Sequence, residues 1–131
     1  MARLYHIDIA IHAANCDRKW ADNLLSRFAI PGVENARQGI ARRLSVDGIC
    51  QVALVRELTQ RLAIPAHVAV DLAITLLGSG GRASLAGGLT LEIDEPEFRR
   101  AVEARIAEAV ESIVPARRGR PPGTTKKGER P

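Results

Sequence analysis

A chain of 131 residues is long enough for one folded domain with an appendage, and its 46% hydrophobic and 26% charged residues are ordinary for a globular protein. Aromatic residues make up only 3%, so we expect an aliphatic core, and no apolar run approaches the ~20 residues of a membrane-spanning helix. The net charge of +4 is unevenly spread: residues 17–43 carry six bases and three acids, residues 44–114 six bases and ten acids, and residues 115–131 six bases and one acid. Two basic segments in an otherwise acidic chain favour an anionic partner.

The first third of the chain has the pattern of two short helices joined by a tight turn. Residues 7–14 are an apolar helix candidate, and residues 18–29 repeat large apolar side chains at helical spacing after a cap at Asp17. Pro31 stops the second helix. Residues 32–44 have no helical pattern and are bracketed by glycines, which predicts a small hairpin, or wing.

Two further helices follow. Ser45 is the expected cap of a helix over residues 46–62, and Pro65 fits the first turn of a helix that continues to Leu77. A glycine-rich joint then leads to residues 82–94, which alternate between apolar and polar side chains. These residues predict a hairpin with the three-residue loop 86–88, because that loop places two leucines on the same face.

The last predicted helix begins at a cap supplied by Asp94 or Glu95 and ends before Pro115. Its apolar stripe, which either packs on the core or forms a dimer interface, consists of Phe98, Val102, Ile106, Val110 and Ile113. Residues 115–131 have no large apolar side chain and are rich in Pro, Gly, Lys and Arg, so we expect them to be disordered.

We therefore predict a mainly α fold with small β elements in three parts. Residues 3–77 form a winged helix-turn-helix, residues 78–114 a β-hairpin with an amphipathic helix, and residues 115–131 a disordered basic tail. Cys16 and Cys50 are expected inside helices as buried thiols, since the N-terminus does not have the pattern of a signal peptide.

The order of segments over residues 5–77 resembles a known family. It runs through Tyr5-x-Ile7, then Asn15-Cys16-Asp17-Arg18-Lys19, Ile30-Pro31-Gly32 and Arg42-Arg43-Leu44-Ser45-x-Asp47. This is similar to the MerR-like winged-helix domain and covers a little over half of the chain; the resemblance implies a DNA-binding winged helix-turn-helix. The chain departs from the family at Asp22, Asn23 and Leu24, where a basic residue and paired tyrosines are usual, and at Leu44, which replaces an aromatic residue. No segment has the pattern of the family's long dimerising coiled coil.

The tail contains a second motif, Arg117-Arg118-Gly119-Arg120-Pro121-Pro122-Gly123. It resembles an AT-hook, in which a thin Gly-Arg-Pro backbone lies in the minor groove of A·T-rich DNA. The second proline stands where a basic residue is more usual, and the alternative is a tail that holds DNA by charge alone.

The side chains that we expect to contact DNA are spread over helix 18–29, the wing and the tail: Arg18, Lys19, Asp22, Arg27, Arg37, Arg42, Arg43, Arg117, Arg118 and Arg120. The basic side chains can reach phosphates or the edges of nucleobases. The start of helix 18–29 offers backbone N–H groups to a phosphate. Asp22 either accepts a hydrogen bond from a cytosine amino group or pairs with a neighbouring basic side chain such as Arg18.

The function that these features favour is sequence-selective binding of double-stranded DNA by a homodimer or higher homo-oligomer in transcriptional control, in the cytoplasm at the nucleoid. One alternative is a phage-type DNA-packaging or recombination accessory factor. Another is a protein-binding adaptor or antitoxin-like partner that acts through residues 82–114. We expect no enzyme, cofactor or membrane association, because no nucleophile–base pair or acid–base dyad is present. His12, Cys16 and Cys50 are too few to hold a metal.

Overall fold

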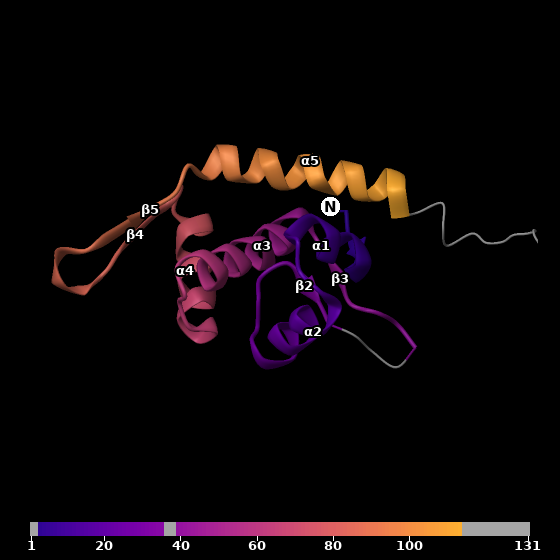
Figure 1. The fold of residues 1–131 in the computed structure, drawn as a ribbon, viewed down its shortest axis with the longest axis horizontal. Helices are drawn as coiled ribbons and strands as arrows, with labels where there is room; N and C mark the ends of the chain where they lie inside the picture. Colours follow the sequence, from indigo (N-terminus) through magenta and orange to yellow (C-terminus); the bar gives the residue numbers. More distant parts are fainter. Residues whose placement is uncertain (1–2, 36–38, 114–131) are drawn as a thin grey trace, which may run out of the picture.

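The computed structural model describes residues 3–35 and 39–113, and it is mainly helical with two small antiparallel sheets (Figure 1). In chain order the elements are β1 (Tyr5–His6), α1 (Ile7–Ala14), α2 (Arg18–Arg27), β2 (Val33–Glu34), β3 (Arg43–Leu44), α3 (Val46–Arg61), α4 (Ala66–Gly78), β4 (Arg82–Ser84), β5 (Thr90–Glu92) and α5 (Glu95–Ile113). A 3-10 turn over Ala86–Gly88 joins the last two strands. None of the helices in the described ranges combines the length and the apolar character that a membrane crossing needs.

The five helices confirm the sequence prediction to within two residues at each end, because their caps are local. Asp17 accepts from the Trp20 N–H at 2.7 Å, Ser45 from the Gly48 N–H at 3.2 Å, and Asp94 from the Glu97 N–H at 3.2 Å. Each oxygen satisfies one of the backbone donors that a helix start leaves open.

The position of Cys16 differs from the prediction. Asn15 adopts the left-handed conformation, with φ 57°, and ends α1, so Cys16 lies in the turn before α2 rather than in a helix. Cys50 lies in α3 and is fully buried.

The expected hairpin in residues 32–44 is confirmed as the antiparallel pair β2–β3, and β1 adds a third strand that the sequence did not predict. The strand order is β1-β3-β2, with Leu44 opposite both Tyr5 and Val33. Strands of two residues are too short to show an alternating pattern, which is why β1 was missed. This sheet fixes the start of α1 beside the start of α3.

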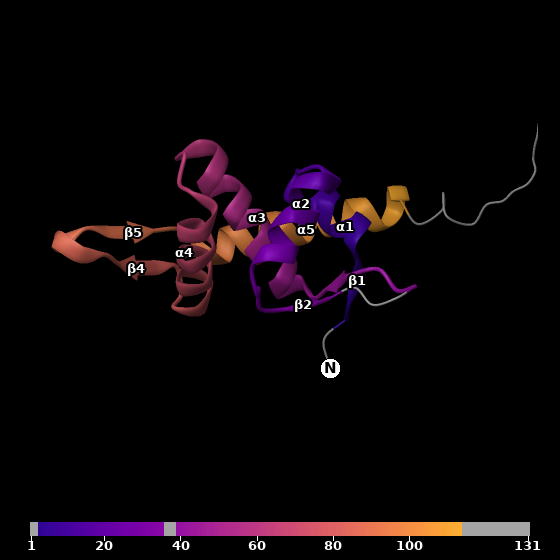
Figure 2. The same cartoon turned by 90° about the horizontal axis from the view of Figure 1, so that it is seen from below.

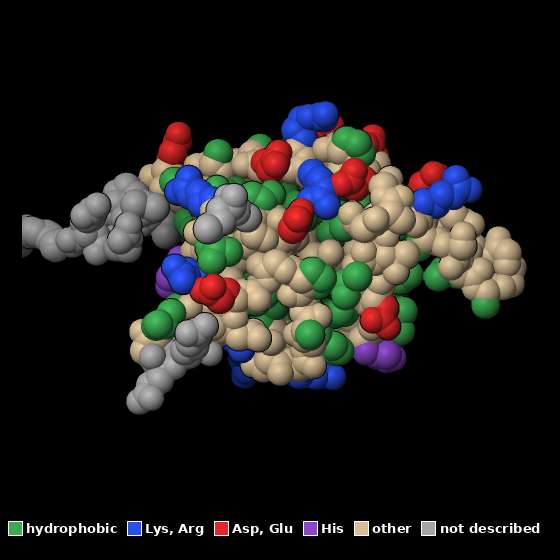
Figure 3. Space-filling view, turned by 180° about the vertical axis from the view of Figure 1, so that it is seen from behind, with side chains coloured by type: hydrophobic (Ala, Val, Ile, Leu, Met, Phe, Trp, Pro, Cys, Tyr) green, Lys and Arg blue, Asp and Glu red, His purple; other side chains and the backbone are tan. Residues whose placement is uncertain are grey.

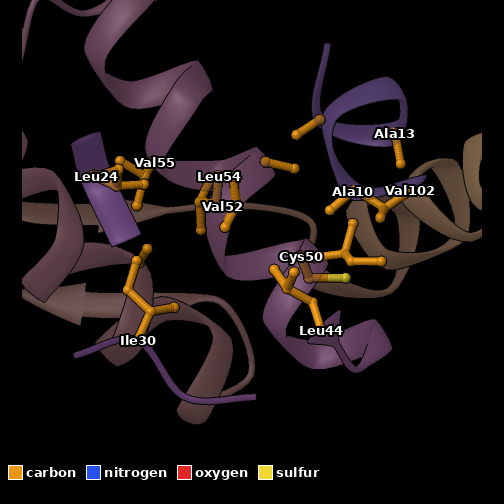
Figure 4. Close-up of a cluster of buried hydrophobic side chains, with 14 of the residues drawn as sticks. Ala10, Ala13, Leu24, Ile30, Leu44, Cys50, Val52, Leu54, Val55 and Val102 are labelled. Carbon is orange, nitrogen blue, oxygen red and sulfur yellow. The ribbon is translucent and has the colours of Figure 1, made fainter. Parts of the chain in front are cut away.

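The middle of the apolar stripe of α5 packs within the chain. Val102 and Ile106 are 0% and 4% exposed, and Ala109 between them and the helix end is fully buried. They belong to one aliphatic cluster with α1, α3 and α4 (Figure 4). Arg105 also donates from Nε to the Ala13 carbonyl of α1 at 2.6 Å. Of the two possibilities that the sequence left open, core packing or a dimer interface, Val102 and Ile106 are therefore in the core.

A glycine pair brings the loop after α2 onto the first turn of α3. Gly32 has a φ of +85°, and a Cβ there would lie 2.5 Å from the Gly48 nitrogen. A Cβ on Gly48 would lie 2.4 Å from the Gly32 carbonyl oxygen. That carbonyl accepts from the Ser45 N–H at 2.9 Å, so the contact also anchors the cap of α3.

The helices form layers. α5 lies along one side of α1 and α3, and α2 lies on the opposite side (Figures 1 and 2). The β4–β5 hairpin projects from one end of the molecule, away from α2 (Figure 1). α2 thus has an outer surface that α5 does not cover.

Candidate nucleic-acid interface

The outer face of α2 is polar. The inner face buries Ala21, Leu24 and Leu25, each at most 4% exposed. Spacing by about one helical turn places Lys19, Asn23 and Arg27 together on the opposite, exposed face. The order of polar and apolar residues in α2 therefore sets which side chains can meet a ligand.

Asp22, beside this face, holds two arginines. Arg42 donates from Nη1 to Asp22 Oδ1 at 3.0 Å, and Arg18 Nε lies 3.3 Å from Oδ2. Arg18 also donates from Nη1 to Asp8 at 3.1 Å. Asp22 accordingly pairs with neighbouring basic side chains, which is one of its two expected roles. Arg18 lies between two carboxylates that offset its charge.

Arg42 links β3 to α2. Its second donor, Nη2, reaches Ser26 Oγ at 3.0 Å, and its side chain is only 17% exposed. Its Nε is buried without a hydrogen-bond partner in the described part of the chain. The geometry is that of a brace between two elements, with little surface left for a ligand.

Arg43 points the other way and pairs across the sheet. It donates from Nη2 and Nε to Glu34 Oε1 at 2.8 and 3.2 Å, and its side chain is 48% exposed. Two donors to one exposed carboxylate contribute little to stability. Arg43 can therefore exchange Glu34 for a phosphate at small cost.

The start of α2 offers fewer backbone N–H groups to a phosphate than the sequence alone suggests. The Asp17 carboxylate already accepts from the Trp20 N–H, and its negative charge opposes a phosphate at this end of the helix. The exposed side chains of α2, rather than the backbone N–H groups at its start, are therefore the surface that a ligand can reach.

Two of the expected contact residues keep an uncompensated charge in the structure. Within the described ranges, no acidic group lies within ion-pair distance of Lys19 or Arg27. Arg27 lies over the Phe28 ring at 5.1 Å, which orients its side chain. The remaining expected contacts, Arg37, Arg117, Arg118 and Arg120, lie outside the described residues.

Asn23 is a candidate that the sequence reading treated only as a departure from the family pattern. It lies one turn after Lys19 and one turn before Arg27. An asparagine amide can bind an adenine edge through two hydrogen bonds, while lysine and arginine bind guanine or phosphate. Its position in the i, i+4, i+8 series with two bases was the signal available in the sequence.

A second candidate region is a polar cleft of about 730 Å³ that lies between α1, α3 and α5. Its polar side chains have partners: His12 Nε2 lies 3.3 Å from Glu108, Arg61 pairs with Glu57, and Arg105 donates to the Ala13 carbonyl. Burial raises the pKa of the Cys16 thiol at its edge to about 11, which keeps the sulfur protonated at neutral pH. Among the described residues, no three His, Cys, Asp or Glu side chains converge as metal ligands. The cleft offers no activated nucleophile in this arrangement.

The outer face of α2 is thus the best candidate for a binding surface. Its support comes from the residues of this chain alone. No protein-family model, curated protein or solved structure matches this chain.

Proposed function

We propose that residues 3–77 form a winged helix-turn-helix that binds double-stranded DNA sequence-selectively in transcriptional control, with α2 as the recognition helix. The observation that carries the proposal is the exposed series Lys19, Asn23 and Arg27 on the outer face of α2. Asn23 supplies an amide that can bind the edge of a nucleobase. Lys19 and Arg27 supply positive charges that have no acidic partner in the described part of the chain.

The dimensions of α2 support this proposal. An α-helix of ~10–12 Å diameter fits a major groove of ~12 Å width, and the ten residues of α2 give ~15 Å of helix to lie along it. The β2–β3 hairpin is tied to α2 through Arg42, so it follows the helix onto the duplex and can bring Arg43 to the backbone. Residues 115–131 would add affinity through their six bases, in the manner of an AT-hook or of a simple basic tail.

The test is a binding site selected from a random DNA pool with the full chain, followed by affinity measurements at fixed salt. Lys19→Ala and Asn23→Ala should each weaken binding to the selected site by ~1–3 kcal/mol, about 5- to 150-fold, and leave binding to unrelated DNA nearly unchanged. Arg18→Ala should have a smaller effect, because Asp8 and Asp22 already offset its charge.

Arg100→Ala is the matched control. Arg100 is an exposed base on α5, on the opposite side of the molecule from α2, and pairs only with its neighbour Glu97 among the described residues. It should change affinity for the selected site by less than twofold. Wild-type affinity in both the Lys19 and the Asn23 variants would remove α2 as the recognition helix.

A further inference from the structure

The β4–β5 hairpin, here called the arm (residues 82–92), has one polar and one apolar side. Its strands pair in register, and the Leu85 N–H donates to the Leu89 carbonyl at 2.6 Å, so the loop is the expected three-residue one. The polar side carries Arg82, Ser84, Thr90 and Glu92. The apolar side carries Ala83, Leu85, Leu89 and Leu91.

The apolar side passes from the core into solvent along the arm. Ala83 is 2% exposed and belongs to the core cluster, Leu91 is half-buried, and Leu85 and Leu89 at the tip are 36% and 63% exposed. Residues 83–91 contain no charged side chain. Figure 3 shows hydrophobic side chains on the projecting arm, with charged side chains where it leaves the body. A two-stranded hairpin is marginally stable by itself. Covering the apolar side of the arm would therefore stabilise the hairpin.

A groove of about 420 Å³ continues this apolar side at the base of the arm. It lies between the end of α3 and the first half of α5, and its apolar lining comes from Leu54, Leu58, Leu62, Ile93, Phe98 and Ala101. Ile93 directly follows β5, so the arm and the groove share one continuous surface. Leu62 on the far wall is 54% exposed.

Six of the nine residues that line the groove are apolar, and two of its three charged residues pair with each other. Arg61 pairs with Glu57, and Arg105 donates to the Ala13 carbonyl. A charged occupant would lose its hydration against a lining that is mainly apolar, in which Arg105 is the one charged residue without an acidic partner among those described. An uncharged apolar segment, such as the tip of the arm, matches it better.

We propose that the arm binds a second copy of this chain, with the Leu85–Leu89 tip of each copy in the groove of the other. A two-fold interface uses the same surface twice, and this surface contains both the projecting part and the recess that it needs. Ile93 and Leu89 are four strand residues apart, or ~13 Å, so two arms that run antiparallel place each tip at the base of its partner.

The size of this contact is adequate. Two tips and two grooves would bury on the order of 1,000 Å², which is about the minimum for a specific interface and fits a dimer of micromolar affinity. The arm projects from one end of the molecule, away from α2, so the association leaves the outer face of α2 accessible (Figures 1 and 2). The inference concerns self-association and holds whether or not α2 binds DNA.

The first test is sedimentation velocity of the full chain, without DNA, over a micromolar concentration range. The wild type should be a dimer, and Leu89→Glu should raise its dissociation constant at least tenfold, because it places a charge in an apolar groove. Thr90→Glu is the matched control: it adds the same charge one residue along, on the polar side of the arm, and should remain dimeric. Unchanged melting temperatures would show that both variants fold.

The second test locates the tip on the partner. In a Cys16→Ser background, Leu89→Cys and Leu62→Cys chains are oxidised separately and as a mixture. A disulfide-linked dimer should form in the mixture and not from either chain alone. A monomeric wild type, an unaffected Leu89→Glu dimer, or equal cross-linking of Leu89→Cys with itself would each overturn the proposal. A monomer whose arm holds a different protein would do so as well.

Discussion

Replacing Ile106 by alanine should destabilise the whole described fold, including elements on the far side from α5. Ile106 is 4% exposed, and losing three buried carbons costs about 2.4 kcal/mol in transfer free energy. A groove of about 430 Å³ borders Ile106 on one side, so neighbouring groups and water can occupy part of the space and the cavity cost is small. Alanine favours the helix by a few tenths of a kcal/mol. The net expectation is a loss of about 2 kcal/mol, or roughly 8 °C in melting temperature.

The assay uses two probes that report on different places. Far-UV circular dichroism follows all helices, and fluorescence follows Trp20, the single tryptophan of the chain, in α2. Because α2 lies across the α1–α3 layer from α5, a common shift in both signals means that α5 belongs to one cooperative unit. Glu103→Ala, an exposed change on the same helix, should shift stability by less than ~0.5 kcal/mol. A Trp20 transition that stays at the wild-type temperature while helical signal is lost earlier would refute the reasoning.

Three further predictions concern the tail, the brace and a buried thiol. Deleting residues 115–131 should flatten the salt dependence of DNA affinity by ~0.9 in slope for each lost phosphate contact, with no change in melting temperature. Arg42→Ala should cost ~1–2 kcal/mol in urea unfolding, because it removes the bonds to Asp22 and Ser26, whereas its exposed neighbour Arg43→Ala should cost less than ~1 kcal/mol. Burial raises the pKa of the Cys50 thiol from 9.0 to about 11, so above pH 9 the unfolded chain loses a proton that the folded state keeps. Stability should therefore fall between pH 9 and 11, and Cys50→Ala should reduce that fall by on the order of 1 kcal/mol per pH unit in urea unfolding.

The helices could be predicted from the sequence because their signals are local. Ser45 and Asp94 mark helix starts by oxygen atoms that bond three residues ahead, and Pro65 marks the start of another. The loop of the arm could be predicted for the same reason, since only one loop length puts Leu85 opposite Leu89.

The packing and the site depend on contacts between distant residues, which a single sequence does not encode in its pattern. The stripe of α5 has the same spacing whether it packs on α1 or on another chain, so only the structure separates the two. Arg42 and Asp22 are 20 residues apart, and their pairing turns an expected DNA contact into a brace. The spacing of Asn23 from Lys19 and Arg27 was a signal in the sequence, but only the structure shows that α2 exposes all three side chains together.

The contact between Gly32 and Gly48 has a genetic consequence. Each missing side chain makes room for a backbone atom of the other loop or helix, so neither residue can compensate for a change at its partner. A methyl group at either position meets peptide atoms that cannot rotate away, and the cap of α3 moves with them. A substitution at one of these glycines should therefore not be rescued by any substitution at the other. Each position should require glycine by itself, and the two should not change together as a compensating pair.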